Sequence, residues 1–486
     1  MIRRIVILDV ALAALLVAGT MGCSRTRGTE SPAPLAGPPI LLFGVDGLEW
    51  DVVLPLIHEG RMPTIARLME RGSSGRISTM SPTSSPIIWT SIATGKIAQK
   101  HGILGFAYGL NGIDGDLQLY TSTDRRTKAF WDILSDYKRT VGTIGWWMTF
   151  PVEPINGIMV AQTNTLPESG INRTVTIMKG MLMRGVDGQV YPAERQDEMI
   201  ELLEQSDAAL PELTRRIFGE FKHPHTELTS RLWQNSQWAF RADATYLSIA
   251  ERIIETADRP ELMAVYMGGP DVVGHRYWRY RQPQKYQHPP TREEIEDYGR
   301  IIDDYYVYVD QSLDRLLRAY GTEVTVIVVS DHGMGPINLD KTYDSDGPSK
   351  EVLSGGHPKE VEPPGVIIAC GPRIRKTPLR KPLSDLQIED LPFLCSVLDV
   401  TPTLLTLMGI PVGRDMDGLA STHIVESDWL DEHKVEAVAT HDTKEWRASR
   451  RAAALRSPHE AERLEQLRAL GYIADDEEAS EEQEKK

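Results

Sequence analysis

The feature that most constrains this chain is a series of short apolar, β-rich runs that alternate with helical patterns. The candidate strands are 40–45, 140–145, 263–267, 324–329 and 366–369. Because these runs are largely apolar, they are typical of strands that are buried on both faces. The alternation therefore predicts an α/β fold, with a mainly parallel sheet that is flanked by helices on both faces.

Helical patterns occupy the segments between these runs. We expect helices at about 49–58, 63–71, 86–94, 127–137, 240–256, 292–319 and 398–408. The clearest follows Pro289-Pro290, where Thr291 and Glu294 form a capping box and apolar residues then recur on one face. This pattern predicts one core-facing helix over 292–319.

The first 23 residues are organised like an export signal. Arg3 and Arg4 precede a mostly apolar run, and small residues precede Cys23. The Gly22-Cys23 junction resembles a bacterial lipoprotein cleavage site, at which Cys23 would be acylated; a simple signal peptide or an uncleaved anchor is the alternative. Residues 24–38 are rich in Ser, Thr, Gly and Pro and predict a flexible tether. We therefore expect an exported protein of the bacterial cell envelope, in the periplasm and anchored to the membrane.

Charge and composition exclude several classes of protein. The 53 Lys and Arg residues against 69 Asp and Glu residues give a net charge of −16, which disfavours a nucleic-acid scaffold as partner. Hydrophobic residues make up 41% and charged residues 25%, which excludes a disordered or polytopic membrane protein. The three cysteines are too few for a disulfide framework. The sequence does not indicate the oligomeric state.

Aspartate and histidine residues follow several predicted strands, at the edge where α/β sheets bind ligands. The candidates are Asp46, the one-turn pair Asp271 and His275, the adjacent pair Asp331 and His332, and His357 in a glycine-flanked loop. Each alone has an ordinary explanation as a turn or loop residue, so only their combination indicates a function. Burying such charges is costly unless they are paired or ligated. This mixed nitrogen and oxygen set suits two zinc ions, or other divalent metals.

Ser85 is the candidate nucleophile. Pro86 predicts the start of a helix, which places Ser85 at its amino end. Free backbone N–H groups and the helix dipole favour an anion there, and a nearby metal ion would favour the deprotonated hydroxyl. The alternative is an ordinary N-cap serine.

Taken in chain order, these residues resemble the alkaline phosphatase superfamily, and most of all its type I phosphodiesterase and nucleotide pyrophosphatase branch. The segments Trp89 to Gly95, His101 to Ile103 and Asp399 to Leu405 support the likeness. It covers about 39–165 and 240–420. The resemblance implies an alkaline phosphatase-like fold, and we interpret the intervening stretch, about 165–238, as an inserted cap because it lacks the strand and helix alternation.

The resemblance also implies a role for each candidate residue. The implied ligand sets for two zinc ions are Asp271, His275 and His357 for one, and Asp46, Asp331, His332 and the oxygen of Ser85 for the other. In relatives the nucleophile lies nine residues before the threonine of a Thr-Gly pair, which selects Ser85 over Ser84. The implied activity is hydrolysis of a phosphoester substrate, of the phosphodiesterase type, through a phosphoserine intermediate.

Two other functions are compatible with the same motifs. One is a phosphotransferase that acts on envelope lipid or glycan head groups, and the other is an inactive binding protein of the same fold. Phe106 stands where nucleotide-cleaving members carry a phosphate-holding asparagine, which disfavours a nucleotide substrate. Nearby aromatic residues belong either to the core or to a leaving-group site; they are Trp146, Trp147, Tyr277, Trp278 and Tyr280.

The span of the motifs predicts one catalytic domain over 39–425, although 486 residues would allow three domains. Residues 426–486 would then form a charged C-terminal extension. Its last segment, 475–486, holds seven acidic residues and two lysines and predicts disorder.

Overall fold

A computed structural model describes residues 37–109, 117–162, 182–184, 186–256, 259–342, 353–357 and 362–452. These residues belong to one compact unit, Leu35–Lys486. The predicted signal segment, nearly all of the tether, the first part of the predicted cap and the acidic end 475–486 lie outside the described residues.

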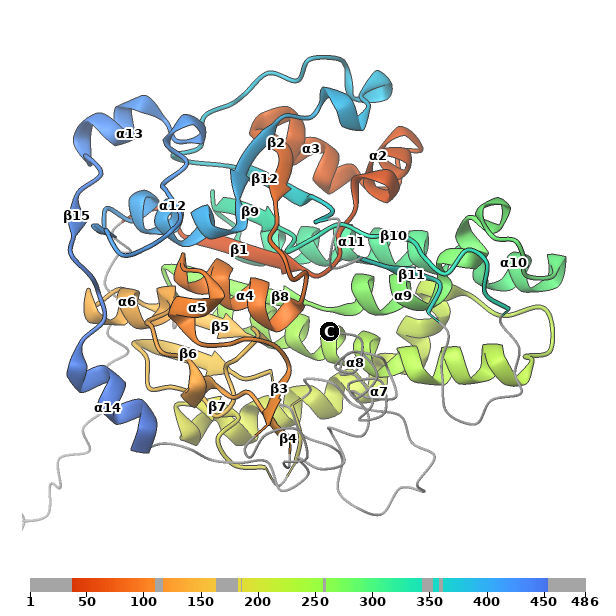
Figure 1. Cartoon of the computed structure of the whole chain (residues 1–486), viewed down its shortest axis with the longest axis horizontal. Helices are drawn as coiled ribbons and strands as arrows, with labels where there is room; N and C mark the ends of the chain where they lie inside the picture. The colour runs from red at the N-terminus through yellow and green to blue at the C-terminus, as the bar shows by residue number, and fades with distance from the viewer. Residues whose placement is uncertain are drawn as a thin grey trace, which may run out of the picture. The chain divides into compact units, whose positions relative to one another are not determined.

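Within the described residues, nine strands form one sheet (Figure 1). Their order is β13 (Phe393–Ser396), β2 (Ser73–Ser78), β12 (Gly365–Cys370), β9 (Thr325–Val329), β1 (Ile40–Val45), β8 (Leu262–Met267), β5 (Val141–Ile144), β6 (Gly157–Val160) and β7 (Val190–Tyr191). The strands from β9 to β6 are mutually parallel, whereas β12 and β7 run antiparallel to their neighbours. The predicted α/β class with a mainly parallel sheet is confirmed.

Both faces of the sheet are buried, and side chains of β1 alternate between two cores. Leu41 and Phe43 pack on the face covered by α2 (Trp50–His58), α3 (Pro63–Arg71), α8 (Glu227–Glu255), α9 (Gly269–Arg281) and α11 (Ile301–Tyr320). Ile40 and Leu42 pack on the face covered by α4 (Ser85–Thr94), α6 (Phe130–Asp136) and α12 (Val400–Leu407). Helices therefore flank both faces, as the sequence predicts.

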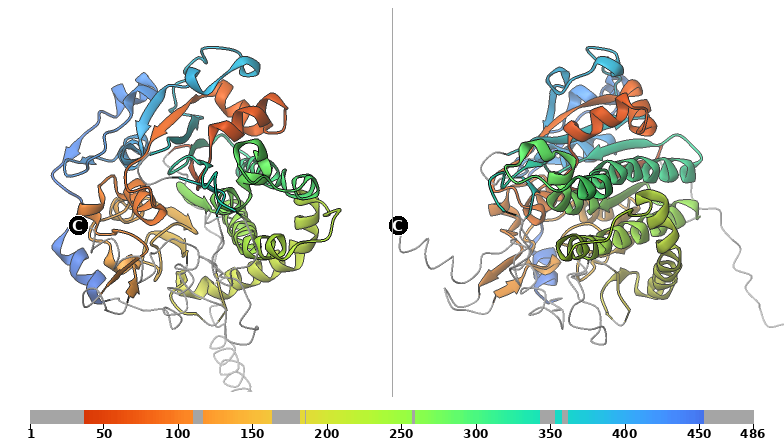
Figure 2. Two further views of the ribbon diagram at one scale, coloured as in Figure 1. Left: turned by 45° about the vertical axis from the view of Figure 1, so that its right-hand side comes forward. Right: turned by 90° about the vertical axis from the view of Figure 1, so that its right-hand side faces the viewer.

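Helix α8 starts much earlier than its predicted counterpart over 240–256. It begins at Glu227, where Thr226 caps it by accepting from the N–H of Thr229, and continues without a break into the core. Helix α7 (Gln196–Phe218) packs along it, and α8, α9 and α11 lie side by side (Figure 2). Of the described helices, none combines the length and apolar character that crossing a bilayer requires.

The single helix expected over 292–319 is wrong, because the chain forms α10 (Arg292–Tyr298) and then α11. The predicted capping box of Thr291 and Glu294 is present at the start of α10. The break falls at Gly299, where a Cβ atom would lie 3.1 Å from the carbonyl oxygen of Tyr280. Close packing against α9 thus interrupts a periodicity that continues in the sequence.

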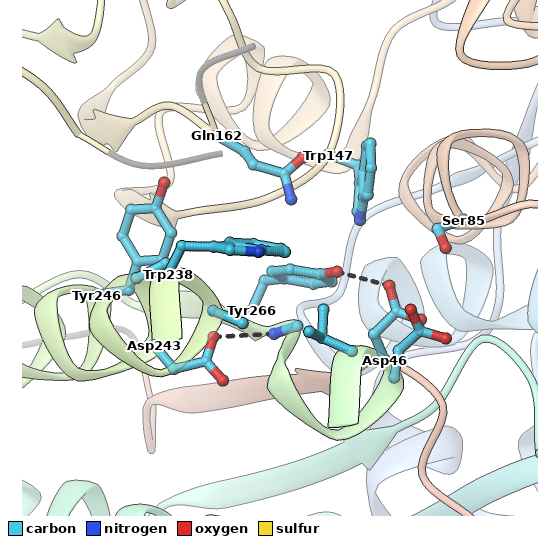
Figure 3. Close-up of a pocket in the computed structure, with 13 residues that line it drawn as sticks. Asp46, Ser85, Trp147, Gln162, Trp238, Asp243, Tyr246 and Tyr266 are labelled. Atoms are coloured by element: carbon cyan, nitrogen blue, oxygen red, sulfur yellow. Dashed lines mark hydrogen bonds between the residues drawn. The ribbon is translucent and has the colours of Figure 1, made fainter. Parts of the chain in front are cut away.

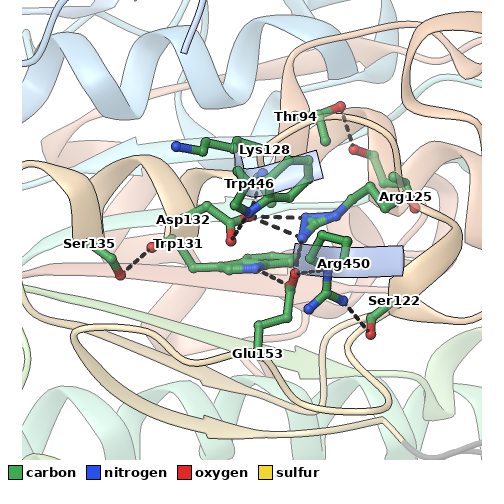
Figure 4. A network of polar contacts seen from close by, with 12 residues as sticks. Thr94, Ser122, Arg125, Lys128, Trp131, Asp132, Ser135, Glu153, Trp446 and Arg450 are labelled. Atoms are coloured by element: carbon green, nitrogen blue, oxygen red, sulfur yellow. Dashed lines mark hydrogen bonds and ion pairs between the residues drawn. The ribbon is translucent and has the colours of Figure 1, made fainter. Parts of the chain in front are cut away.

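The described part of the C-terminal extension ends in α14 (Lys444–Ala452), which a buried ionic network joins to the rest of the unit (Figure 4). Arg450 Nε lies 3.1 Å from Glu153 Oε1, and Arg125 Nη2 lies 2.6 Å from the same atom and 3.0 Å from Asp132 Oδ2. Burial raises the pKa of Glu153, but the charges of Arg125 and Arg450 outweigh it and hold that pKa below its usual value. Removing one member of such a buried network costs about 3–5 kcal/mol.

Candidate active site

The site is built at the carboxyl ends of three neighbouring parallel strands. Asp46 follows β1, Asp331 and His332 follow β9, and α9 follows β8 and carries Asp271 and His275. The Asp46 N–H donates to the carbonyl of Met267 at 2.9 Å, so the ends of β1 and β8 stay paired up to the site. Adjacent parallel strands therefore bring together residues that lie far apart in the sequence.

All six predicted metal ligands converge in space. His332 Nε2 lies 3.4 Å from Asp46 Oδ1 and 3.2 Å from Asp331 Oδ2. Around Asp271 Oδ1, the Nε2 atom of His275 lies at 3.2 Å and that of His357 at 3.7 Å. Two triads have ligand atoms within 4.8 Å of one another: Asp46, Asp331 and His332, and Asp271, His332 and His357. The first contains the aspartate and histidine members of a set expected from the sequence, which also included the Ser85 oxygen, whereas in the second His332 stands where His275 was expected.

Burial makes the cluster strongly unfavourable without a cation. Asp331 is completely buried, and its pKa is raised well above the usual value by burial and by the charges of Asp46 and Asp271. Burial also raises the pKa of Asp271, but the neighbouring imidazoles, His275 foremost, outweigh it and hold that pKa below its usual value. Three carboxylates that face one another in a buried site need compensating positive charge.

The donor atoms fit a divalent metal such as zinc. Asp271 Oδ1, Asp331 Oδ2 and His332 Nε2 are buried and have no hydrogen-bond partner among the described residues. The Nδ1 atoms of His275 and His332 each lie near a main-chain carbonyl oxygen. The distance is 2.9 Å from His275 Nδ1 to the Gly355 oxygen and 3.1 Å from His332 Nδ1 to the Gly333 oxygen. If Nδ1 carries the proton and donates it to the carbonyl, the Nε2 lone pair points at the cluster, as in many metal-binding histidines. Mixed nitrogen and oxygen donors are the set that zinc accepts.

Two aromatic residues that the sequence analysis did not single out hold Asp46. The Tyr266 hydroxyl donates to Asp46 Oδ2 at 2.5 Å, and Trp89 Nε1 donates to the same oxygen at 3.2 Å. These bonds leave Oδ1 facing His332. A tyrosine within the apolar run of β8 was the available signal, since a buried hydroxyl requires a partner.

Ser85 is the first residue of α4 and lies one turn before Trp89. Because residues four apart share a face of a helix, the bond from Trp89 to Asp46 also brings Ser85 to the cluster. Ser85 lines a pocket together with Asp46 and Asp271 (Figure 3). The N-cap residue is Ser84, so the alternative interpretation of Ser85 as the N-cap serine is wrong.

Aromatic side chains form one wall of this pocket (Figure 3). They are Trp147, Trp238, Tyr246 and Tyr266, with Gln162 beside them. Trp238 and Tyr246 are eight residues apart on α8 and share a face of that helix. Of the five aromatic residues noted in the sequence, Trp147 lines the pocket, and the other four are fully buried core residues. Phe106 packs edge-on against Trp147, with ring centroids 5.7 Å apart.

His101, which lies in one of the supporting sequence motifs, is a buried structural residue. Its Nδ1 accepts from the N–H of Ile103 at 3.2 Å, and its Nε2 lies 3.0 Å from the Ser91 hydroxyl. Burial, assisted by the charge of Arg125, lowers the pKa of His101 to about 3, so the ring is neutral.

Comparison with known proteins gives a family match. The family model for type I phosphodiesterase / nucleotide pyrophosphatase matches residues 40–372. The chain belongs to this family. That span includes every predicted site residue from Asp46 to His357, and the activity class of the chain is phosphoester hydrolase.

Solved structures of low sequence identity resemble this type I phosphodiesterase family member. Human ectonucleotide pyrophosphatase / phosphodiesterase 5 is 13% identical, with 81% of this chain and 99% of that chain covered and a TM-score of 0.44. The murine protein is also 13% identical, with 76% and 95% covered and a TM-score of 0.42. Phosphonoacetate hydrolase from Sinorhizobium meliloti 1021 is 18% identical, with 63% and 58% covered and a TM-score of 0.37. We rest the functional proposal on the family match and the site geometry.

Metal removal tests the buried carboxylate cluster. We expect added zinc to raise the free energy of unfolding of chelator-treated protein by about 2.7 kcal/mol when its concentration is about 100 times the dissociation constant. Calorimetry over a zinc series measures the accompanying rise in Tm. In Asp331→Asn protein the zinc-dependent rise should shrink, whereas the metal-free protein should be at least as stable as wild type, because one buried charge is gone. An unchanged zinc response in this variant would contradict the assignment.

Proposed function

We propose that this family member is a two-zinc phosphodiesterase in which Ser85 is the nucleophile. The observation that carries the proposal is the position of Ser85 at the amino end of α4, in one pocket with Asp46 and Asp271. Two overlapping groups of candidate ligand atoms, which share His332, support metal binding at this place. The proposed ligands are the six predicted residues and the Ser85 oxygen.

When bound, the zinc ions would neutralise the carboxylates, lower the pKa of the Ser85 hydroxyl and stabilise charge on the phosphoryl and leaving-group oxygens. Tyr266 and Trp89 hold Asp46 in one orientation, and the main-chain N–H of Gly47 donates to Asp331 Oδ1 at 3.3 Å. The start of α4 presents its positive dipole end to a phosphoryl oxygen.

The reaction proceeds by two displacements at phosphorus. The Ser85 oxygen attacks in line while its proton passes to solvent; its bond to phosphorus forms and the bond to the leaving alkoxide breaks, which gives a phosphoserine ester at residue 85 that keeps the second alcohol of the diester. Water then attacks the phosphoserine, and the Ser85 hydroxyl is regenerated as a phosphomonoester leaves. In the alternative phosphotransferase, an alcohol of an envelope lipid or glycan takes the place of water.

Replacement of Ser85 tests the nucleophile. We expect Ser85→Ala to lower kcat for bis(4-nitrophenyl) phosphate by about 10³-fold or more, because the covalent route is lost. The release of 4-nitrophenol measures the rate, and zinc content measures whether the metal site survives.

Ser84→Ala is the matched control, since Ser84 is the N-cap of α4 and its side chain makes no capping hydrogen bond. This variant should keep wild-type activity. Full activity in Ser85→Ala protein would overturn the proposal, and a wild-type protein that binds zinc but cleaves no ester would favour the inactive binding protein. Transfer of the phosphoryl group to added glycerol would favour the phosphotransferase.

We further propose that the aromatic wall accepts an apolar substituent of the diester. Trp238 supports this assignment because it lines the pocket and retains 8% exposure. The two aromatic residues of α8 place this substituent site partly on the helix that joins the predicted cap to the core.

Trp238→Leu tests the substituent site. We expect kcat/KM for bis(4-nitrophenyl) phosphate to fall about tenfold, mainly through KM, because ring stacking contributes about 0.5–1.5 kcal/mol. The monoester 4-nitrophenyl phosphate has the same leaving group without the second ring, and its kcat/KM should change little. Equal losses for both esters would contradict this role for Trp238.

We also propose that Cys23 is acylated and anchors the chain to the membrane on the periplasmic side of a bacterial envelope. The support is the signal-like segment before Cys23 and the tether-like composition of 24–38. Cys23→Ser should move the protein from the membrane fraction to the soluble periplasmic fraction, as measured by fractionation and immunoblotting. Membrane association that survives the substitution would instead favour an uncleaved anchor.

A further inference from the structure

Helix α8 contacts the start of the ligand-bearing helix α9 through a single buried carboxylate. Asp243 Oδ1 accepts from the N–H of Gly268 at 2.9 Å (Figure 3). Asp243 Oδ2 accepts from the N–H of Gly269 at 2.9 Å. Asp243 is only 2% exposed. Both of its oxygens thus bind consecutive main-chain N–H groups where β8 passes into α9.

The start of α9 cannot cap itself. Its N-cap residue is Gly268, which has no side chain to accept from the first N–H groups of the helix, and Pro270 follows Gly269. Asp243 supplies the missing acceptor from another helix, and its carboxyl group lies at the positive end of the α9 dipole. Hydrogen bonds from main-chain N–H groups to a carboxylate are among the stronger ones in proteins.

Tyr305 of α11 completes this contact. Its hydroxyl donates to Asp243 Oδ2 at 2.8 Å. The same hydroxyl lies where a Cβ atom at Gly269 would be, 1.8 Å from that ideal position, so only glycine fits there. The first turn of α9 is therefore held by α8 and α11 together.

Asp271 follows two residues after Gly269 and its position depends on this turn. Gly47, in the loop after β1, lies close to Asp271. A Cβ atom at Gly47 would lie 3.1 Å from the Asp271 Cα atom, and Gly47 has a φ of +66°. The loop after β1 and the start of α9 are therefore in tight contact beside the metal ligands. A small displacement of α9 would move Asp271 relative to the ligands that follow β1 and β9.

We propose that Asp243 is a positioning residue of the metal site, which holds the amino end of α9 so that Asp271 meets the other ligands. This inference rests on the proposed two-zinc function. His275 is held separately, because its Nδ1 lies 2.9 Å from the carbonyl oxygen of Gly355. Loss of Asp243 therefore weakens the proposed zinc site of Asp271, His275 and His357 more than the proposed site of Asp46, Asp331 and His332.

The test is the zinc affinity of full-length Asp243→Asn protein, measured by competition with a chromophoric chelator. Asparagine keeps the shape but replaces one acceptor by an NH2 group that faces a backbone N–H. We expect one of the two zinc ions to bind about 10–100-fold more weakly, as for other residues that orient metal ligands. The second ion should bind with nearly wild-type affinity.

Asp310→Asn is the matched control. Asp310 is 1% exposed and accepts from the N–H groups of Thr64 and Ile65, at 3.2 and 2.7 Å, at the start of α3. Asp310 makes the same kind of contact as Asp243, but away from the metal ligands. We therefore expect Asp310→Asn to lower Tm about as much as Asp243→Asn does, and to leave the affinity for both zinc ions unchanged. Tyr305→Phe, which leaves both N–H contacts of Asp243 in place, should show a smaller loss of zinc affinity than Asp243→Asn and serves if that variant does not fold.

The outcomes test the positioning role of Asp243 and the two-zinc function separately. Wild-type zinc affinity in Asp243→Asn protein, or equal losses in the Asp243 and Asp310 variants, would overturn the positioning role. If Asp243→Asn does not fold, wild-type zinc affinity in Tyr305→Phe protein would overturn it. Wild-type protein that binds no zinc would overturn the two-zinc function itself.

Discussion

The burial of three carboxylates at one edge of the sheet is the constraint on which the site depends. Asp46, Asp271 and Asp331 are at most 4% exposed. Burial raises the pKa of Asp331, and the charges of Asp46 and Asp271 raise it further. A protein interior stabilises such a group only with a cation or with strong hydrogen bonding. Three imidazoles supply part of the compensation and offer nitrogen atoms to metal ions. The cations that would balance this charge are the ones that the proposed mechanism uses.

Neutral donors around the cluster determine which carboxylate oxygens face it. Tyr266 and Trp89 bind one oxygen of Asp46, and the N–H of Gly47 binds one oxygen of Asp331. Asp243 acts one step further away, through the backbone that leads to Asp271. Because these contacts come from α4, α8 and the sheet, the geometry of the site depends on packing across several elements. The packing of α8 also links the metal site to the aromatic wall of the pocket.

Much of the architecture could be predicted, because buried parallel strands and capped helices have local signals. All five predicted strands are present, as is the capping box at Thr291. Strand β2 escaped prediction because its sequence, SSGRIS, carries no apolar run; pairing with β12 and β13 makes it a strand. Gly299 packs closely against α9, and α7 packs along α8; local periodicity does not contain these contacts. Tyr266 and Asp243 escaped notice for the same reason, and Trp89 was noted only as part of a family motif, without its contact to Asp46.

The sequence by itself determined the fold class, the family motifs and the seven candidate residues, because most of these residues follow a strand or open a helix in the local pattern, and the motif order adds His357 from a glycine-flanked loop. The tertiary structure decided which of these residues meet. Strand order places β9, β1 and β8 side by side, and this adjacency brings the ligands together. It also decided that His332 lies between the two triads and that Trp147 and Trp238 share the pocket with Ser85. Distances between residues that are hundreds of positions apart follow from packing and pairing, and no local pattern encodes them.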